Sequence, residues 1–124
     1  MKTELTIEES AKLIKLGVDK KLASRRTLSV DTPTEIPNLY RKGEEGKSIF
    51  TLTDILTILP KMLIDKYGKN NPLGMEFDDD YMAWTAYYLG GGYVETKTEL
   101  IDALFHLLCW VIENRYTDLK TNKT

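Results

Sequence analysis

Apolar residues along this chain follow first a helical and then a strand spacing, and together they predict three helices and a small sheet. Three times a threonine stands three residues before an acid at the start of a helically spaced apolar run. In such a capping box the hydroxyl accepts a hydrogen bond from the third helical N–H, and the acid reaches back to the N–H of the cap residue. The three pairs are Thr6 with Glu9, Thr51 with Asp54, and Thr96 with Glu99. They predict helices over residues 7–16, 52–59 and 97–114.

The segment before the last helix has the alternation of a β-sheet. Leu73, Met75 and Phe77 alternate with small or acidic residues, and three aspartates at positions 78–80 form a turn. Residues 81–89 are rich in aromatic and other strand-forming residues, until three consecutive glycines end the strand. Residues 73–113 are therefore expected to form a β-hairpin followed by an apolar helix.

Two segments leave alternatives open. Pro60 disfavours helical geometry at the preceding residue, so residues 61–67 form either a continued, kinked helix or a strand; we favour the strand. Residues 25–48 show little periodicity, and a loop of about 24 residues is long for a compact domain. It is interpreted as a functional arm, as an arm exchanged in a dimer, or as a loop that contains an unrecognised strand.

These elements predict one α+β domain over residues 1–124, a length that can bury a core without disulfides or metals. A small antiparallel β-hairpin or three-stranded meander would pack against an N-terminal helix, a short middle helix and a long apolar C-terminal helix.

Apolar residues cover well over half of the circumference of the C-terminal helix. A helix that covers one face of a sheet needs an apolar stripe of only about 100°. The excess predicts a second contact surface, formed by the N-terminal helices or by another subunit, and so favours a homodimer. The remaining polar stripe is about 60° wide at 100° per residue. It consists of Asp102, His106, Cys109 and Glu113.

This polar stripe is the one place where candidate catalytic residues meet in the sequence. Asp102 could orient His106, and His106 could activate Cys109 as a nucleophile, or the three could ligate zinc. Helical spacing alone creates no oxyanion hole, and no second ligand cluster accompanies them. We interpret the stripe as the solvent-exposed side of the helix, and expect no catalytic residues, no metal and no cofactor. The aspartates at 78–80 also lack the later ligands of a calcium loop.

Charge adds one further candidate site. The net charge is −2, so the whole molecule is not a polyanion binder by bulk electrostatics. A local basic cluster nevertheless predicts a surface that could contact the phosphates of a nucleic acid. Its members are Lys12, Lys15, Lys20, Lys21, Arg25 and Arg26. A single cysteine, an N-terminus without a secretory signal and the lack of a long apolar run predict a cytoplasmic protein without a membrane span.

Three blocks of sequence carry a resemblance. They are LTIEESAKLIKLG at 5–17, IFTLTDILTILPK at 49–61 and ELIDALFHLLCWVIEN at 99–114. Together they resemble an uncharacterised family of short proteins from Bacteroidetes and their phages or mobile elements, which implies no known activity. The order of two strands, a glycine turn and TKTELIDAL at 96–104 is also similar to HicB-type antitoxin domains.

The hypothesis that follows is a non-enzymatic protein-interaction or accessory protein of phage or mobile-element type that acts as a homo-oligomer. The alternative is a nucleic-acid-associated regulator, similar to HicB-type antitoxins, that uses the basic residues of segment 12–26.

Overall fold

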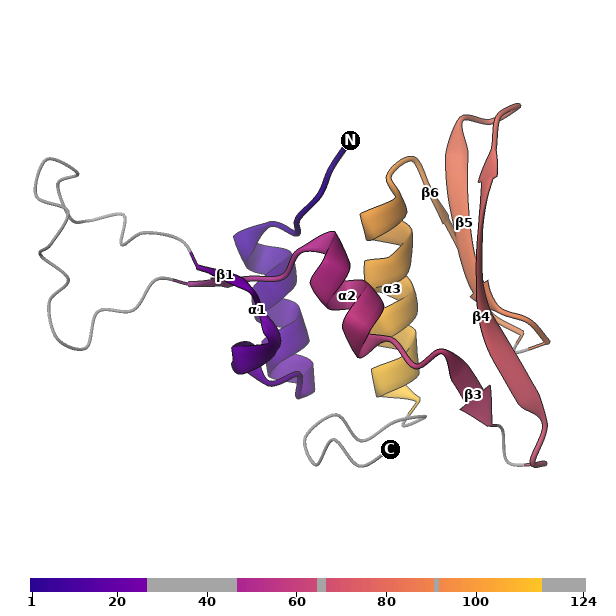
Figure 1. Cartoon of the computed structure of the whole chain (residues 1–124), viewed down its shortest axis with the longest axis horizontal. Helices are drawn as coiled ribbons and strands as arrows, with labels where there is room; N and C mark the ends of the chain where they lie inside the picture. Colours follow the sequence, from indigo (N-terminus) through magenta and orange to yellow (C-terminus); the bar gives the residue numbers. More distant parts are fainter. Residues whose placement is uncertain (27–46, 65–66, 91, 115–124) are drawn as a thin grey trace, which may run out of the picture.

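Helix α3 lies between a helical layer and a four-stranded sheet in the computed structural model of the chain (Figure 1). The structure describes residues 1–26, 47–64, 67–90 and 92–114. The helices are α1 (Ile7–Leu16), the short 3-10 helix η1 (Lys20–Leu22), α2 (Leu52–Ile58) and α3 (Leu100–Glu113). The strands are β1 (Arg25–Arg26), β2 (Ser48–Ile49), β3 (Met62–Ile64), β4 (Asn70–Asp78), β5 (Ala83–Tyr88) and β6 (Val94–Lys97). The predicted α+β class is confirmed.

The first two capping boxes are present as predicted. The Thr6 hydroxyl accepts a hydrogen bond from the Glu9 N–H at 3.1 Å, and the Glu9 carboxylate accepts from the Thr6 N–H at 2.9 Å. Thr51 and Asp54 make the same reciprocal pair at the start of α2. Gly17 ends α1 in the left-handed region at φ 118°, which glycine adopts without steric cost. Local sequence therefore determines both ends of α1.

The third predicted capping box does not form. Thr96 lies in β6, where its hydroxyl is 3.1 Å from the hydroxyl of Thr85 on β5. Helix α3 consequently begins at Leu100 instead of residue 97, and its cap residue Glu99 makes no side-chain capping bond. The Glu99 carboxylate instead accepts a hydrogen bond from the Lys2 N–H at 2.8 Å.

The sheet is an antiparallel meander in the order β3-β4-β5-β6, one strand more than predicted. The preferred interpretation of residues 61–67 is confirmed by β3, which is described over Met62–Ile64; residues 65 and 66 lie outside the described residues. Strand β5 begins at Ala83 instead of residue 81, because residues 79–82 form the turn. Sequence analysis missed β6, whose four residues are too few to show an alternation.

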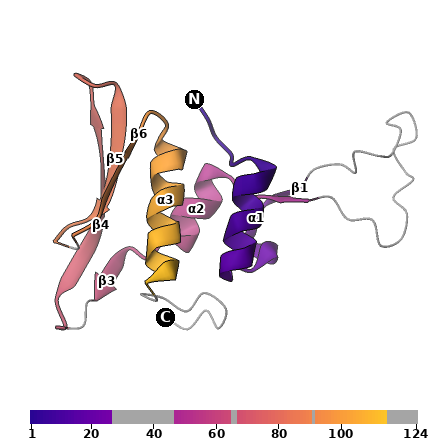
Figure 2. The same ribbon diagram turned by 180° about the vertical axis from the view of Figure 1, so that it is seen from behind.

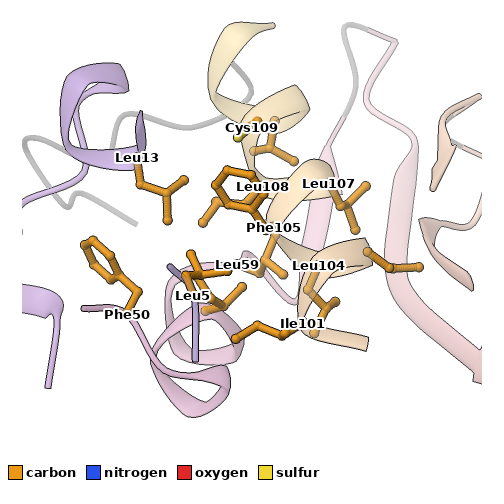
Figure 3. Close-up of a cluster of buried hydrophobic side chains, with 14 of the residues drawn as sticks. Leu5, Leu13, Phe50, Leu59, Ile101, Leu104, Phe105, Leu107, Leu108 and Cys109 are labelled. Carbon is orange, nitrogen blue, oxygen red and sulfur yellow. The ribbon is translucent and has the colours of Figure 1, made fainter. Parts of the chain in front are cut away.

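The apolar excess of α3 is covered within the chain. One side of the helix contacts β5 and β6, and the other contacts α1 and α2, an arrangement visible from both directions (Figures 1 and 2). Leu13 and Phe50 from the helical layer belong to the same buried hydrophobic cluster as Phe105 and Leu108 (Figure 3). On the sheet side, Tyr93 stacks on Trp110 with ring centroids 4.7 Å apart. Of the two predicted explanations, the N-terminal helices account for the excess without another subunit.

The ends of the expected loop at residues 25–48 pair with each other. Strands β1 and β2 are antiparallel, with Arg25 opposite Ile49 and Arg26 opposite Ser48. This short pairing is the strand that the sequence did not reveal; residues 27–46 lie outside the described residues. In the described part of the chain, none of the helices has the length and apolarity needed to cross a membrane.

Candidate functional site

The predicted polar stripe of α3 is not a solvent-exposed side and does not form a catalytic arrangement. Asp102 and His106 are half-buried, Cys109 is buried and only Glu113 is exposed. The Asp102 carboxylate accepts a hydrogen bond from the Lys2 ammonium at 2.6 Å, and the same ammonium contacts Glu9 at 3.0 Å. Among the described residues, no hydrogen bond joins Asp102, His106 and Cys109 to one another.

The thiol of Cys109 is unsuited to act as a nucleophile. Burial raises its pKa to about 11, against a weaker opposing effect of the positive charge of Lys12. A thiol with this pKa is protonated near neutral pH, whereas the thiolate is the nucleophile and metal ligand. The hypothesis of catalysis or zinc binding by this stripe therefore has no support in its geometry.

The turn between β4 and β5 holds the one group of potential metal ligands in the described part of the chain. The carboxylates of Asp78, Asp79 and Asp80 lie within 4.8 Å of one another, and all three residues are exposed. Exposed acidic groups commonly occur without an ion, and no buried ligand joins them here. We therefore treat this turn as a concentrated negative charge and not as a metal centre.

The structure places the six basic residues that sequence analysis grouped together in different surroundings. Lys12 lies about 130° around α1 from the face of Ile7, Ala11 and Ile14, at 100° per residue, on the side of α3 where it influences Cys109. Arg25 forms an ion pair with Glu4 at 3.1 Å. Phosphate contact by the basic cluster as a whole stays a prediction. Lys15 and Lys21 are exposed, and neither lines the pocket in which two of the other residues meet.

Lys20 and Arg26 do come together, in a pocket beside α1. The pocket has a volume of about 310 Å³. Three of its lining residues are cationic, and they come from η1, β1 and the residue preceding β2. Three others form an apolar wall along one face of α1. The lining residues are Ile7, Ala11, Ile14, Lys20, Arg26, Lys47 and Ser48.

Two local features create this basic pocket. The spacing 7, 11, 14 brings three side chains of α1 to one face, and Gly17 lets the chain turn back so that η1 lies beside that helix. The antiparallel pairing of Arg26 with Ser48 then brings Lys47 to the same wall as Arg26. Sequence analysis missed Lys47, because the β1–β2 pairing across residues 27–46 has no sequence signal.

The pocket can accommodate an apolar side chain flanked by anionic groups. Ligand sites in proteins usually have volumes of about 300–1,000 Å³ and combine apolar walls with a few polar or charged groups. The basic pocket lies at the lower end of that range, which suits a side chain or short segment better than a large cofactor.

Comparisons with known proteins identify no relative. No protein-family model matches the chain, and neither a curated protein nor a solved structure matches it.

Proposed function

We propose that this chain is a non-enzymatic protein-interaction protein, whose basic pocket receives an acidic, partly apolar segment of a partner protein. The observation that carries the proposal is the composition of the pocket, which is lined by three cations from separate segments of the chain and by an apolar wall on α1. Charged groups at such an interface orient the partner and disfavour proteins of unsuitable charge, while apolar contact supplies affinity. The buried, protonated thiol of Cys109 and the ion pair of Asp102 with Lys2 support the non-enzymatic part of the proposal.

A nucleic acid is the weaker candidate for the occupant. A protein that binds a nucleic acid through its phosphates gains affinity with each cation that displaces counterions from the nucleic acid, and such proteins make about 6–10 phosphate contacts over an extended surface. Here three cations gather in a concave site, Lys12 lies on another side of α1, and Arg25 pairs with Glu4. An apolar wall formed by Ile7, Ala11 and Ile14 also offers a phosphate nothing to contact.

Two defined probes test this proposal on the full chain. A labelled copolymer of glutamate and tyrosine presents acidic and apolar side chains on a polypeptide, and a labelled DNA duplex presents phosphates. We expect fluorescence anisotropy to show tighter binding of the copolymer, and NMR to show shifts of the Ile7 and Ile14 methyl signals on its addition. Arg26→Gln should weaken copolymer binding roughly tenfold, since a charge-assisted hydrogen bond contributes about 1.5–3 kcal/mol.

Lys15→Gln is the matched control, because it removes one positive charge from α1 outside the pocket. It should bind the copolymer nearly as tightly as the wild type. Equal binding by the Arg26→Gln variant, or unshifted Ile7 and Ile14 signals, would overturn the proposal. Tighter binding of DNA that Arg26→Gln abolishes would replace it with the nucleic-acid function.

A further inference from the structure

The tip of the β4–β5 hairpin is acidic and partly apolar, and so complements the cations and the apolar wall that line the basic pocket. Asp78, Asp79 and Asp80 place three exposed carboxylates within 4.8 Å of one another. Beside them, Tyr81 is 80% exposed and Met82 is 64% exposed. We define residues 78–82 as the acidic tip. It offers three negative charges and two apolar side chains to a pocket with three positive charges and an apolar wall.

The hairpin holds the acidic tip in a defined shape. Asp78 accepts a hydrogen bond from the Asp80 N–H at 2.9 Å through its side chain, which closes the turn. At the base of the turn, the rings of Phe77 and Trp84 lie 5.2 Å apart on paired positions of β4 and β5. The hairpin extends past the start of α3, so the acidic tip projects from the rest of the molecule (Figure 1).

The acidic tip and the basic pocket lie on opposite sides of the molecule. The pocket is formed by α1, η1, β1 and the start of β2, and the tip belongs to the sheet. Helix α3 separates these two layers in both views (Figures 1 and 2). The two surfaces therefore cannot meet within one chain, but they can meet between two copies.

We propose that the partner is a second copy of this chain, which inserts its acidic tip into the basic pocket of the first. This inference rests on the proposed function, because it requires the pocket to bind an acidic segment. Each copy would use one surface as donor and the other as acceptor, and such head-to-tail contacts generate rings or open filaments. The expected homo-oligomer is therefore a head-to-tail filament or ring of copies, instead of a dimer formed through α3.

Self-association of the full chain is the first test. Sedimentation velocity should show a mass that increases with protein concentration at about 50 mM salt, because opposite charges attract most strongly when the Debye length is long. At about 500 mM salt, the association should weaken at least roughly tenfold. A monomer at high micromolar concentration and low salt would overturn the inference.

Two charge-neutralised variants test the geometry. The tip variant carries Asp79→Asn and Asp80→Asn, which leave the Asp78 carboxylate that closes the turn. The pocket variant carries Lys20→Gln and Arg26→Gln. Each variant alone should remain monomeric. Their equimolar mixture should form a one-to-one dimer that grows no further, since it retains one intact tip and one intact pocket.

Lys15→Gln and Glu113→Gln are the matched controls, because each removes one exposed charge outside both surfaces. Both should associate as the wild type does. A symmetric dimer that forms equally well in the tip variant, or a mixture of variants that stays monomeric, would contradict head-to-tail contact. If the pocket binds the glutamate–tyrosine copolymer but the chain stays monomeric, only this inference fails and the proposed function stands.

Discussion

At the scale of single residues, burial decides what the polar groups can do, and Cys109 is the clearest case. Its helical spacing from His106 and Asp102 makes it a candidate nucleophile in the sequence, yet the residue is only 4% exposed. Because burial raises the pKa of the thiol to about 11, only about a thousandth of it would be thiolate at pH 8. The same side chain behaves as a small apolar residue of the core.

We therefore expect Cys109 to be inert in the folded protein. A thiol-specific disulfide reagent at pH 8 should label it only as fast as the protein unfolds, because labelling requires an accessible thiolate. The urea-unfolded protein, in which the thiol has its ordinary pKa, should react completely within the mixing experiment. Complete labelling with the near-UV circular dichroism unchanged would show that Cys109 is accessible after all.

Asp54 has the opposite role, because its charge is stabilised by neighbouring groups. Its carboxylate accepts hydrogen bonds from the Thr51 N–H at 2.9 Å, the Ser24 N–H at 2.8 Å and the Ser24 hydroxyl at 2.9 Å. Burial alone would raise the pKa of Asp54, but these hydrogen bonds outweigh it and hold the pKa below the ordinary value of 3.8. Asp54 thereby caps α2 and fastens it to the segment between η1 and β1.

Asp54→Asn should lower the free energy of unfolding by about 1.5–3 kcal/mol at pH 7, the usual contribution of hydrogen bonds to a charged group. Because the pKa is lower in the folded state, the stabilisation is present above about pH 4 and is lost as the pH falls through the folded-state value. Urea unfolding at pH 7 and at pH 3 should therefore show a smaller loss of stability on acidification in the variant. Asp19→Asn, at the exposed cap of η1, should change the stability far less.

At the scale of elements, short-range signals predict those parts of the fold that neighbouring residues determine. The capping boxes and Gly17 predict the positions of α1 and α2, because each signal involves only residues within one helical turn of one another. The same spacing fails at Thr96, because pairing with β5 uses Thr96 as a strand residue. A strand of four residues depends on its sheet partner for stability, and that long-range contact has no local signature.

Helix α3 is the element on which both layers depend. Leu104 and Leu108 are fully buried within the core between the sheet and the helical layer. We expect Leu108→Ala to lower the free energy of unfolding by about 2–5 kcal/mol, through lost apolar burial and the cavity left behind. Chemical denaturation followed by circular dichroism measures this loss. Ile64→Ala removes a residue that is 66% exposed and should have little effect; a similar loss in both variants would contradict the central position of α3.

At the scale of the whole molecule, charge is arranged in a way that the net value of −2 conceals. Positive side chains meet at the basic pocket and negative ones at the acidic tip, on opposite sides of the molecule. Both charged segments are visible in the sequence, because the basic residues between Lys20 and Arg26 lie close together and the three aspartates are consecutive. The sequence could not show that Lys47 completes the pocket or that α3 separates the pocket from the tip. Both facts depend on contacts between distant parts of the chain.

The N-terminal segment, which precedes α1, connects α1 and the start of α2 to α3. The Leu5 N–H donates to the Phe50 carbonyl at 2.9 Å, and the Leu52 N–H donates to the Thr3 carbonyl at 2.8 Å. The Lys2 ammonium then bridges Glu9 on α1 and Asp102 on α3 at 3.0 Å and 2.6 Å. Burial would lower the pKa of Lys2, but the two carboxylates outweigh this effect and raise the pKa above its ordinary value of 10.5.

Lys2→Met should therefore lower the free energy of unfolding by about 1–2 kcal/mol near neutral pH, because it leaves two carboxylates close together without their cation. The contribution of Lys2 is fully present below about pH 10 and is lost as the pH rises through the folded-state pKa, so the difference between the variant and the wild type should shrink in strong alkali. Urea unfolding at a series of pH values measures it, with Lys15→Met as a matched control on an exposed face of α1. Equal stability of the Lys2→Met variant and the wild type at pH 7 would mean that backbone pairing alone holds the N-terminal segment in place.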